Sequence, residues 1–194
     1  MKRKNIVILT SIALITIIFA TIGLTNSKVE AKSNVTMGNV YEIVEVLQNE
    51  PNKVADFIFL DDDGNKCSLS EYTKGKYVFQ NFWGTWCPPC RGEIPTIIEL
   101  QKENNEQLIM IGIALEKNHN NQKENVMNYA KNQGINYINF VGPAAVIGKL
   151  QSKYNGIPSI PTTHLINKDG VIVETIVGAR NKAGFQASLD KLMK

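Results

Sequence analysis

Two cysteines, Cys87 and Cys90, stand only two residues apart and are separated by two prolines. They follow a short apolar run, residues 77–83, which is typical of a buried strand, and they precede a helical pattern of isoleucines. Cys87 is therefore expected near the N-cap of a helix, with Pro88 and Pro89 in the first turn, where a missing N–H costs little. A thiol at this place faces the positive end of the helix dipole and ionises more easily.

A disulfide between these cysteines would close a very small loop, and small loops contribute little entropic stabilisation. A purely structural bridge therefore explains the pair poorly, whereas redox chemistry explains it well. A zinc site would need two further ligands, and the remaining candidates, Cys67, His119 and His164, are isolated in the sequence. We expect redox chemistry without a metal or other cofactor, with a structural disulfide and a zinc site as the alternatives. Cys67 is expected to be a buried, unreactive thiol.

Apolar runs and helical periodicities alternate along most of the chain. Strands are expected at residues 57–60, 66–69, 77–83, 108–115, 137–141, 162–166 and 171–177, and helices after Cys90 and at residues 124–133, 145–154 and 182–193. Turns rich in Asp, Asn and Gly join the first two and the last two of these strands into hairpins. This order predicts an α/β domain with a mixed central sheet and helices on both of its faces.

The first 31 residues differ in character from the rest. Three basic residues at positions 2–4 precede residues 6–24, a run of 19 residues without a charge. That run exceeds the roughly 7 to 15 residues of a signal-peptide core and reaches the roughly 18 needed to span a bilayer. We therefore expect residues 1–31 to be a membrane anchor, with the chain from Lys32 onward on the extracytoplasmic side. The alternative is a signal peptide cleaved near Ala31, which would leave a secreted protein.

Residues 32–52 are mostly polar and are interpreted as a linker. Within them, apolar residues from Val40 to Leu47 recur at helical spacing, and Pro51 ends the pattern. The domain proper is expected to cover residues 53–194.

The excess positive charge belongs to the N-terminal segment. Residues 1–31 hold four of the 21 basic residues and one of the 18 acidic residues, which leaves 17 of each sign in the remainder. An exported domain without net charge has no long-range field to attract a polyanion. Nucleic acid is therefore not expected as a partner.

Several separate features accompany the cysteine pair. Trp83 and Trp86 lie around the motif, Pro95 follows Cys90 by five residues, and the stretch IPTT stands at residues 160–163, before a strand. Together these features resemble the active site of the thioredoxin superfamily. A paired cysteine motif alone would be weak support, but the combination is specific.

The resemblance extends beyond the motif. Residues 52–194 resemble the TlpA/ResA-like branch of the superfamily, whose members are exported and often membrane-tethered thiol-disulfide oxidoreductases. The N-terminal hairpin and an extra helix-strand unit at residues 118–141 match this branch rather than thioredoxin itself. The resemblance implies a thioredoxin-like fold with a mixed central sheet flanked by helices, an N-terminal β-hairpin and a helix-strand insertion.

Thiol exchange then defines the roles of the two cysteines. Cys87, as a thiolate, would attack the disulfide of a partner protein, and Cys90 would attack Cys87 to release the reduced partner. Asn81 stands where thioredoxin has a buried aspartate, and an amide cannot take a proton from Cys90. Glu93, three residues after Cys90 on the helix, is expected to share its face and to act as a base in place of that aspartate. The alternative for Glu93 is a solvated surface glutamate.

The resemblance also implies a substrate-binding surface. Pro161 would be the cis-proline opposite the cysteine pair, and Ile160 would offer its backbone to an incoming peptide. An ordinary trans bond is the alternative, because cis X-Pro bonds are uncommon. Trp86, Pro88 and Pro89 would complete the surface around the cysteines.

The predicted function is an extracytoplasmic thiol-disulfide oxidoreductase, a monomer that reduces disulfides of exported proteins. The resemblance implies a role such as keeping the haem-binding cysteines of apocytochrome c reduced, with electrons from a membrane thiol-transfer protein. Two alternatives remain open. One is an oxidant that installs disulfides in secreted proteins, and the other is a non-catalytic peptide-binding module on the same fold.

Overall fold

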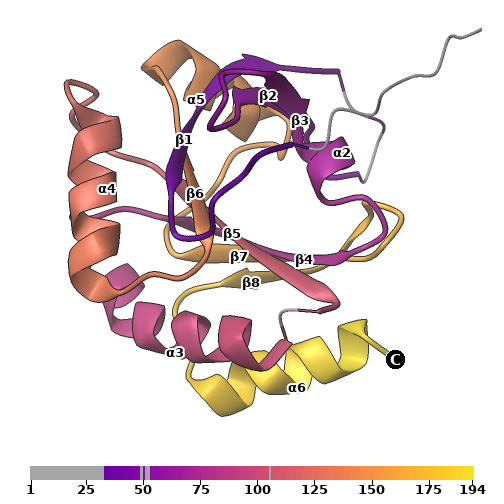
Figure 1. Ribbon diagram of the computed structural model, residues 1–194. Coiled ribbons are helices and arrows are strands. Elements are labelled where there is room, and N and C mark those ends of the chain that lie inside the picture. Colours follow the sequence, from indigo (N-terminus) through magenta and orange to yellow (C-terminus); the bar gives the residue numbers. More distant parts are fainter. Residues whose placement is uncertain (1–32, 49, 51–52, 105) are drawn as a thin grey trace, which may run out of the picture. The chain divides into compact units, whose positions relative to one another are not determined.

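Strands and helices alternate through the structure, a computed structural model that describes residues 33–48, 50, 53–104 and 106–194 (Figure 1). The strands are β1 (Val40–Val46), β2 (Phe57–Leu60), β3 (Lys66–Ser68), β4 (Tyr77–Trp83), β5 (Leu108–Ala114), β6 (Ile138–Val141), β7 (Thr162–Ile166) and β8 (Ile172–Val177). The helices are α2 (Leu69–Tyr72), α3 (Pro88–Asn104), α4 (Gln122–Gln133), α5 (Ala144–Ser152) and α6 (Lys182–Leu192). The predicted elements from residue 57 onward are confirmed apart from small shifts at their ends, such as Leu69, which begins α2 instead of ending β3.

The described strands join one mixed sheet in the order β3-β2-β1-β6-β5-β4-β7-β8. The four central strands, β1, β6, β5 and β4, run parallel to their neighbours among themselves. The remaining pairs are antiparallel, including the two predicted hairpins, β2 with β3 and β7 with β8. The predicted extra unit, α4 with β6, places β6 between β1 and β5. The mixed central sheet expected from the sequence is therefore confirmed.

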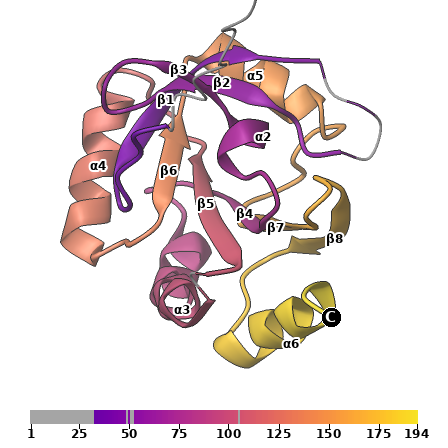
Figure 2. The same cartoon turned by 45° about the vertical axis from the view of Figure 1, so that its right-hand side comes forward.

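Two hydrophobic cores lie on opposite faces of the sheet. Helices α3, α4 and α6 contribute to one core, in which Trp83, Ile97 and Phe185 are fully buried. Helices α2 and α5 contribute to the other, in which Phe82 and Phe140 are fully buried. Figure 2 shows α3 and α6 on one side of β4 and β7, with α2 and α5 on the other. Because neighbouring residues of a strand point to opposite faces, β4 supplies side chains to both cores.

Strand β1 corrects the prediction of a linker with a helical turn. Residues 40–46 form a strand that pairs with β2 on one side and with β6 on the other. The register shifts between Ile43 and Glu45, and both Ile43 and Val46 are buried. Such an irregularity in a strand lets buried residues recur at a spacing of three, which imitates a helical period. The compact unit that contains the sheet begins at Ser33 rather than at residue 53.

The segment before β1 is held by Asp62, which lies in the turn between β2 and β3. The carboxylate of Asp62 accepts hydrogen bonds from the hydroxyl of Thr36 at 2.6 Å, the amide of Asn39 at 2.9 Å and the hydroxyl of Tyr41 at 3.0 Å. These bonds, that from the Thr36 hydroxyl above all, favour the ionised form and hold the pKa of Asp62 below its usual value. The N-terminal part of the described chain is thus tied to the hairpin.

Strand β4 leads into the cysteine motif. It lies inside the sheet between β5 and β7 and ends at Trp83, after which a short turn leads into α3. The turn lies at the carboxyl ends of parallel strands, which is where α/β sheets commonly place their binding sites. Pro95 lies inside α3, the helix predicted to follow the cysteines.

None of the helices that the structure describes combines the length and the apolar character that a bilayer span requires. The predicted anchor at residues 6–24 and the alternative cleavage site near Ala31 lie outside the described residues.

Candidate active site

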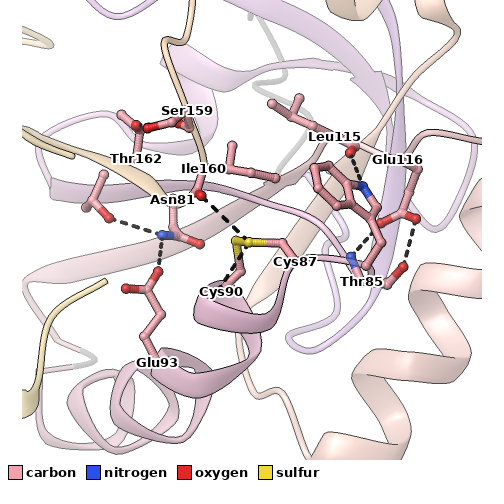
Figure 3. Close-up of a disulfide and its surroundings, with 12 residues drawn as sticks. Asn81, Thr85, Cys87, Cys90, Glu93, Leu115, Glu116, Ser159, Ile160 and Thr162 are labelled. Atoms are coloured by element: carbon pink, nitrogen blue, oxygen red, sulfur yellow. Dashed lines mark hydrogen bonds between the residues drawn. A yellow bond between two sulfur atoms is a disulfide. The ribbon is translucent and has the colours of Figure 1, made fainter. Parts of the chain in front are cut away.

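The two cysteines lie where β4 leads into α3 and are joined by a disulfide (Figure 3). Cys87 ends the turn, Pro88 and Pro89 take the first two helical positions, and Cys90 follows in the first turn. The two Cα atoms are 5.3 Å apart. The backbone N–H of Cys90 points to Cys87 Sγ at a distance of 3.3 Å. The helix N-terminus thus presents a donor to the first sulfur, as expected for a thiol that ionises easily.

Neither cysteine is freely exposed in the disulfide form. Cys87 is 3% exposed and Cys90 is fully buried. That Cys87 reacts first with a partner stays a prediction.

The loop before β7 lies against the disulfide. The peptide bond between Ile160 and Pro161 is cis, as predicted. The carbonyl oxygen of Ile160 is 3.7 Å from Cys87 Sγ, and the carbonyl of Pro161 accepts a hydrogen bond from the N–H of Gly178 at 2.8 Å. The structure therefore places the backbone of Ile160 beside the first sulfur.

Apolar side chains surround the disulfide. Trp86 is 43% exposed, Pro88 and Pro89 are exposed, and Ile160 is half-buried. Exposed apolar residues gathered at one place are typical of a surface that binds another molecule. The structure thus brings the predicted substrate-binding residues together around the sulfurs.

The loop after β5 contacts the active-site turn and holds it in place. The sequence did not indicate these contacts. The carboxylate of Glu116 accepts two hydrogen bonds from Thr85, one from its N–H and one from its hydroxyl, both at 2.8 Å. The indole N–H of Trp86 donates to the carbonyl of Leu115 at 2.9 Å, and Lys117 Nζ lies 3.9 Å from the centroid of the indole ring. The signal available was position, because residues that follow neighbouring parallel strands meet at one edge of the sheet.

Glu93 lies beneath the disulfide on α3 and is only 2% exposed. Asn81 Nδ2 donates to its Oε1 at 2.9 Å, and the backbone N–H of Arg180 donates to its Oε2 at 3.3 Å. Burial raises the pKa of Glu93 to about 7, although both hydrogen bonds favour the ionised form. A carboxyl group with a pKa near 7 is present in both its protonated and its ionised form at neutral pH. It can therefore take up or release a proton during a reaction. The alternative of a solvated surface glutamate does not agree with this burial.

Comparison with known proteins places the site in a family. The Redoxin family profile matches residues 49–192. The chain belongs to the Redoxin family.

Individual Redoxin-type relatives support the same assignment. The thiol-disulfide oxidoreductase ResA of Bacillus thuringiensis subsp. konkukian is 35% identical over 153 residues, which is 78% of this chain and 80% of that protein. ResA of Bacillus subtilis is 30% identical over 184 residues, which is 94% of this chain and 90% of that protein. The crystal structure of a thiol:disulfide interchange protein of the thioredoxin family from Chlorobium tepidum gives a TM-score of 0.61 at 34% identity and covers 76% of this chain and all 100% of that one. The predicted thioredoxin-like fold and the assignment to ResA-like thiol-disulfide oxidoreductases are therefore confirmed.

Three other candidates for chemistry lie away from this Redoxin site. Cys67 is buried in β3, where burial raises the pKa of its thiol, as expected for an unreactive cysteine. His164 is buried in β7, and burial lowers its pKa to about 4, so it is neutral at physiological pH. His119 is exposed just before α4. Within the described ranges, no group of three or more His, Cys, Asp or Glu residues is arranged to hold a metal ion.

Proposed function

We propose that this chain is an extracytoplasmic thiol-disulfide oxidoreductase that works through Cys87 and Cys90 and reduces disulfides of exported proteins. The observation that carries the proposal is the position of Glu93, a buried carboxyl group on the same helix as the disulfide with a pKa raised to about 7. A nearby carboxylate opposes the formation of a second negative charge on the sulfurs and can accept the proton of a buried thiol.

The reaction begins with the reduced protein. The Cys87 thiolate attacks one sulfur of the substrate disulfide, which forms a mixed disulfide and releases the other substrate sulfur as a thiolate that takes up a proton. Cys90 then loses its proton, with Glu93 as the base, and its thiolate attacks Cys87 Sγ. The second substrate sulfur leaves as a thiolate and takes up a proton, which Glu93 can return, so the substrate has gained two electrons and two protons. The protein then holds the Cys87–Cys90 disulfide.

The proposed reducing role is supported by the small number of groups that stabilise the Cys87 thiolate. A strong oxidant favours its reduced form through a well-solvated, hydrogen-bonded thiolate. Here the N–H of Cys90 lies 3.3 Å from Cys87 Sγ and stabilises the thiolate, but Pro88 and Pro89, which precede it in the first turn, have no N–H to add. With limited stabilisation of the thiolate, we expect a potential nearer the roughly −270 mV of thioredoxin than the roughly −120 mV of a strong oxidant.

The substrate is proposed to be a peptide segment that carries a disulfide. It would lie along the backbone of Ile160 beside the cis Pro161, with the exposed Trp86, Pro88 and Pro89 on its other side. Haem-binding cysteines of apocytochrome c are one substrate of this kind. A membrane thiol-transfer protein would return the electrons.

Equilibration of the protein with glutathione buffers tests the direction of electron flow. A potential more oxidising than about −180 mV, the value of an isomerase-type enzyme, would contradict the reducing role. The protein would then be an oxidant that installs disulfides in secreted proteins. Mixed disulfides captured in cells with Cys90→Ser would then identify the substrate, with Cys67→Ser as the matched control that captures none. If the double variant Cys87→Ser and Cys90→Ser kept full activity in cells, the protein would be a peptide-binding module instead.

Residues 1–31 are proposed to stay attached and to anchor the domain in the membrane. Cell fractionation followed by intact-mass measurement checks this, and the full-length chain is expected in the membrane fraction. A soluble exported form that begins at Lys32 would identify a cleaved signal peptide.

A further inference from the structure

Asn81 holds a buried amide whose two ends have different surroundings. It lies in β4 and is 1% exposed. Its Nδ2 donates two hydrogen bonds, to Glu93 Oε1 at 2.9 Å and to Thr163 Oγ1 at 3.1 Å. Its Oδ1 is buried and has no hydrogen-bond partner among the described residues. Figure 3 shows this oxygen on the side of the amide that faces the disulfide.

A buried amide oxygen without a partner is unfavourable, because it has lost its hydrogen bonds to water without gaining others. A disulfide has no hydrogen to donate, so the oxidised form cannot relieve this cost. Reduction creates S–H donors on the side to which this oxygen is turned (Figure 3). Of the two sulfurs, Cys87 Sγ already lies against the N–H of Cys90 and the carbonyl of Ile160, whereas Cys90 Sγ is fully buried and has no hydrogen-bond partner among the described residues.

We propose that Asn81 is a positioning residue whose Oδ1 accepts a hydrogen bond from the Cys90 thiol that forms when the disulfide is reduced. The inference rests on the proposed function and adds to it the group that holds the second thiol. This hydrogen bond exists only in the reduced form. The same amide donates to Glu93 Oε1, so Asn81 joins the thiol to the buried carboxyl group.

Reduction of the Cys87–Cys90 disulfide is an ordinary dithiol exchange. A reducing dithiol supplies two electrons and two protons and becomes a disulfide, while the bond between Cys87 Sγ and Cys90 Sγ breaks. One proton ends on Cys90 Sγ, from which it points to Asn81 Oδ1. A hydrogen bond that the reduced form alone contains must favour reduction. Asn81 therefore makes the disulfide easier to reduce than it would be beside an apolar residue.

The redox equilibrium of Asn81→Leu, measured in the full-length protein with a dithiothreitol couple, tests the proposal. Leu has nearly the shape of Asn and accepts no hydrogen bond. The equilibrium constant for reduction is expected to fall by about five- to tenfold, and tenfold corresponds to a potential about 30 mV more negative. Thiol counting after rapid alkylation gives the reduced fraction.

Gln80→Met is the matched control. Gln80 is the neighbour of Asn81 in β4, is also buried, and also has an amide oxygen without a partner, but it faces the opposite core, where its Nε2 donates to Tyr154 OH at 2.9 Å. Its substitution should leave the equilibrium within about twofold of the wild type. Equal shifts in the two variants, or no shift in Asn81→Leu, would overturn the proposal.

A spectroscopic readout covers the case in which Asn81→Leu does not fold. In the Cys67→Ala, Cys87→Ala variant, Cys90 is the sole thiol, and its S–H stretching band should lie below that of a thiol without an acceptor. A band at the free-thiol position would contradict the inference. Failure of the proposed function looks different, because the wild-type protein would then reduce no protein disulfide, whatever the position of the Cys90 band.

Discussion

The buried carboxyl group of Glu93 gives the stability of the oxidised protein a specific dependence on pH. Its pKa is about 7 in the folded protein and 4.5 in an unperturbed chain. The folded state thus binds the proton more tightly than the unfolded state does. The contribution of Glu93 to the free energy of unfolding is complete below about pH 4.5 and is lost as the pH rises to about 7. With 1.36 kcal/mol for each pKa unit, the loss is about 3 kcal/mol.

Glu93→Gln removes this dependence, because the amide is neutral at every pH and resembles the protonated acid. It can still accept the hydrogen bond from Asn81, but its NH₂ group cannot accept the one from Arg180, which costs about 1 kcal/mol. The quantity to measure is therefore the change with pH of the difference in unfolding free energy between variant and wild type. We expect this difference to shift by about 3 kcal/mol in favour of the variant between about pH 4 and about pH 8.

Urea unfolding of the oxidised proteins at several pH values gives these free energies. Glu99→Gln is the matched control, since Glu99 lies on the same helix with a 58% exposed side chain and a surface ion pair to Lys182. Its difference from wild type should stay within about 1 kcal/mol throughout. A difference for Glu93→Gln that is equally flat would refute the argument that burial raises the pKa of Glu93.

Three further outcomes follow. Brief alkylation of the reduced protein should label Cys87 well before Cys90, and faster labelling of Cys90 would reverse their roles. Glu93→Gln should lower the thiol pKa values, measured from alkylation rates against pH, because it removes a negative charge near the sulfurs; values that rise or stay fixed would contradict this. Gly112→Ala should destabilise the protein by about 3 kcal/mol or more in urea, because a Cβ there would lie 2.0 Å from Asn139 Oδ1; a near-neutral effect would mean that Asn139 can move aside.

The parts of the fold that could be predicted from the sequence depend on local patterns. β4 and α3 are both readable from residues 77–98, since a compact apolar run and a helical period adjoin the cysteine motif. The cis bond before Pro161 and the inward direction of Glu93 also came from local motifs, through the resemblance that they carry.

The parts that could not be predicted depend on contacts between distant residues. β1 is a strand because Tyr41 packs against Phe59 and Phe140, neither of which its own segment reveals. The hydrogen bonds from Thr85 to Glu116 join residues 31 positions apart. A pattern within one segment cannot encode such pairs, because each depends on which strands become neighbours.

The position of β1 in the sheet also affects the order in which the protein can fold. The hairpin of β2 and β3 joins the remaining strands through β1, and β1 pairs with β6, whose residues lie about a hundred positions later in the chain. During synthesis from the N-terminus, the first strand of the sheet must therefore wait until residue 141 is available. Closing a loop of this length precedes the gain from the pairing, so we expect the hairpin side of the sheet to assemble late and slowly. Substitutions at Phe140, which contacts the rings of Phe57 and Phe59, should then change the folding rate of the chain as well as its stability.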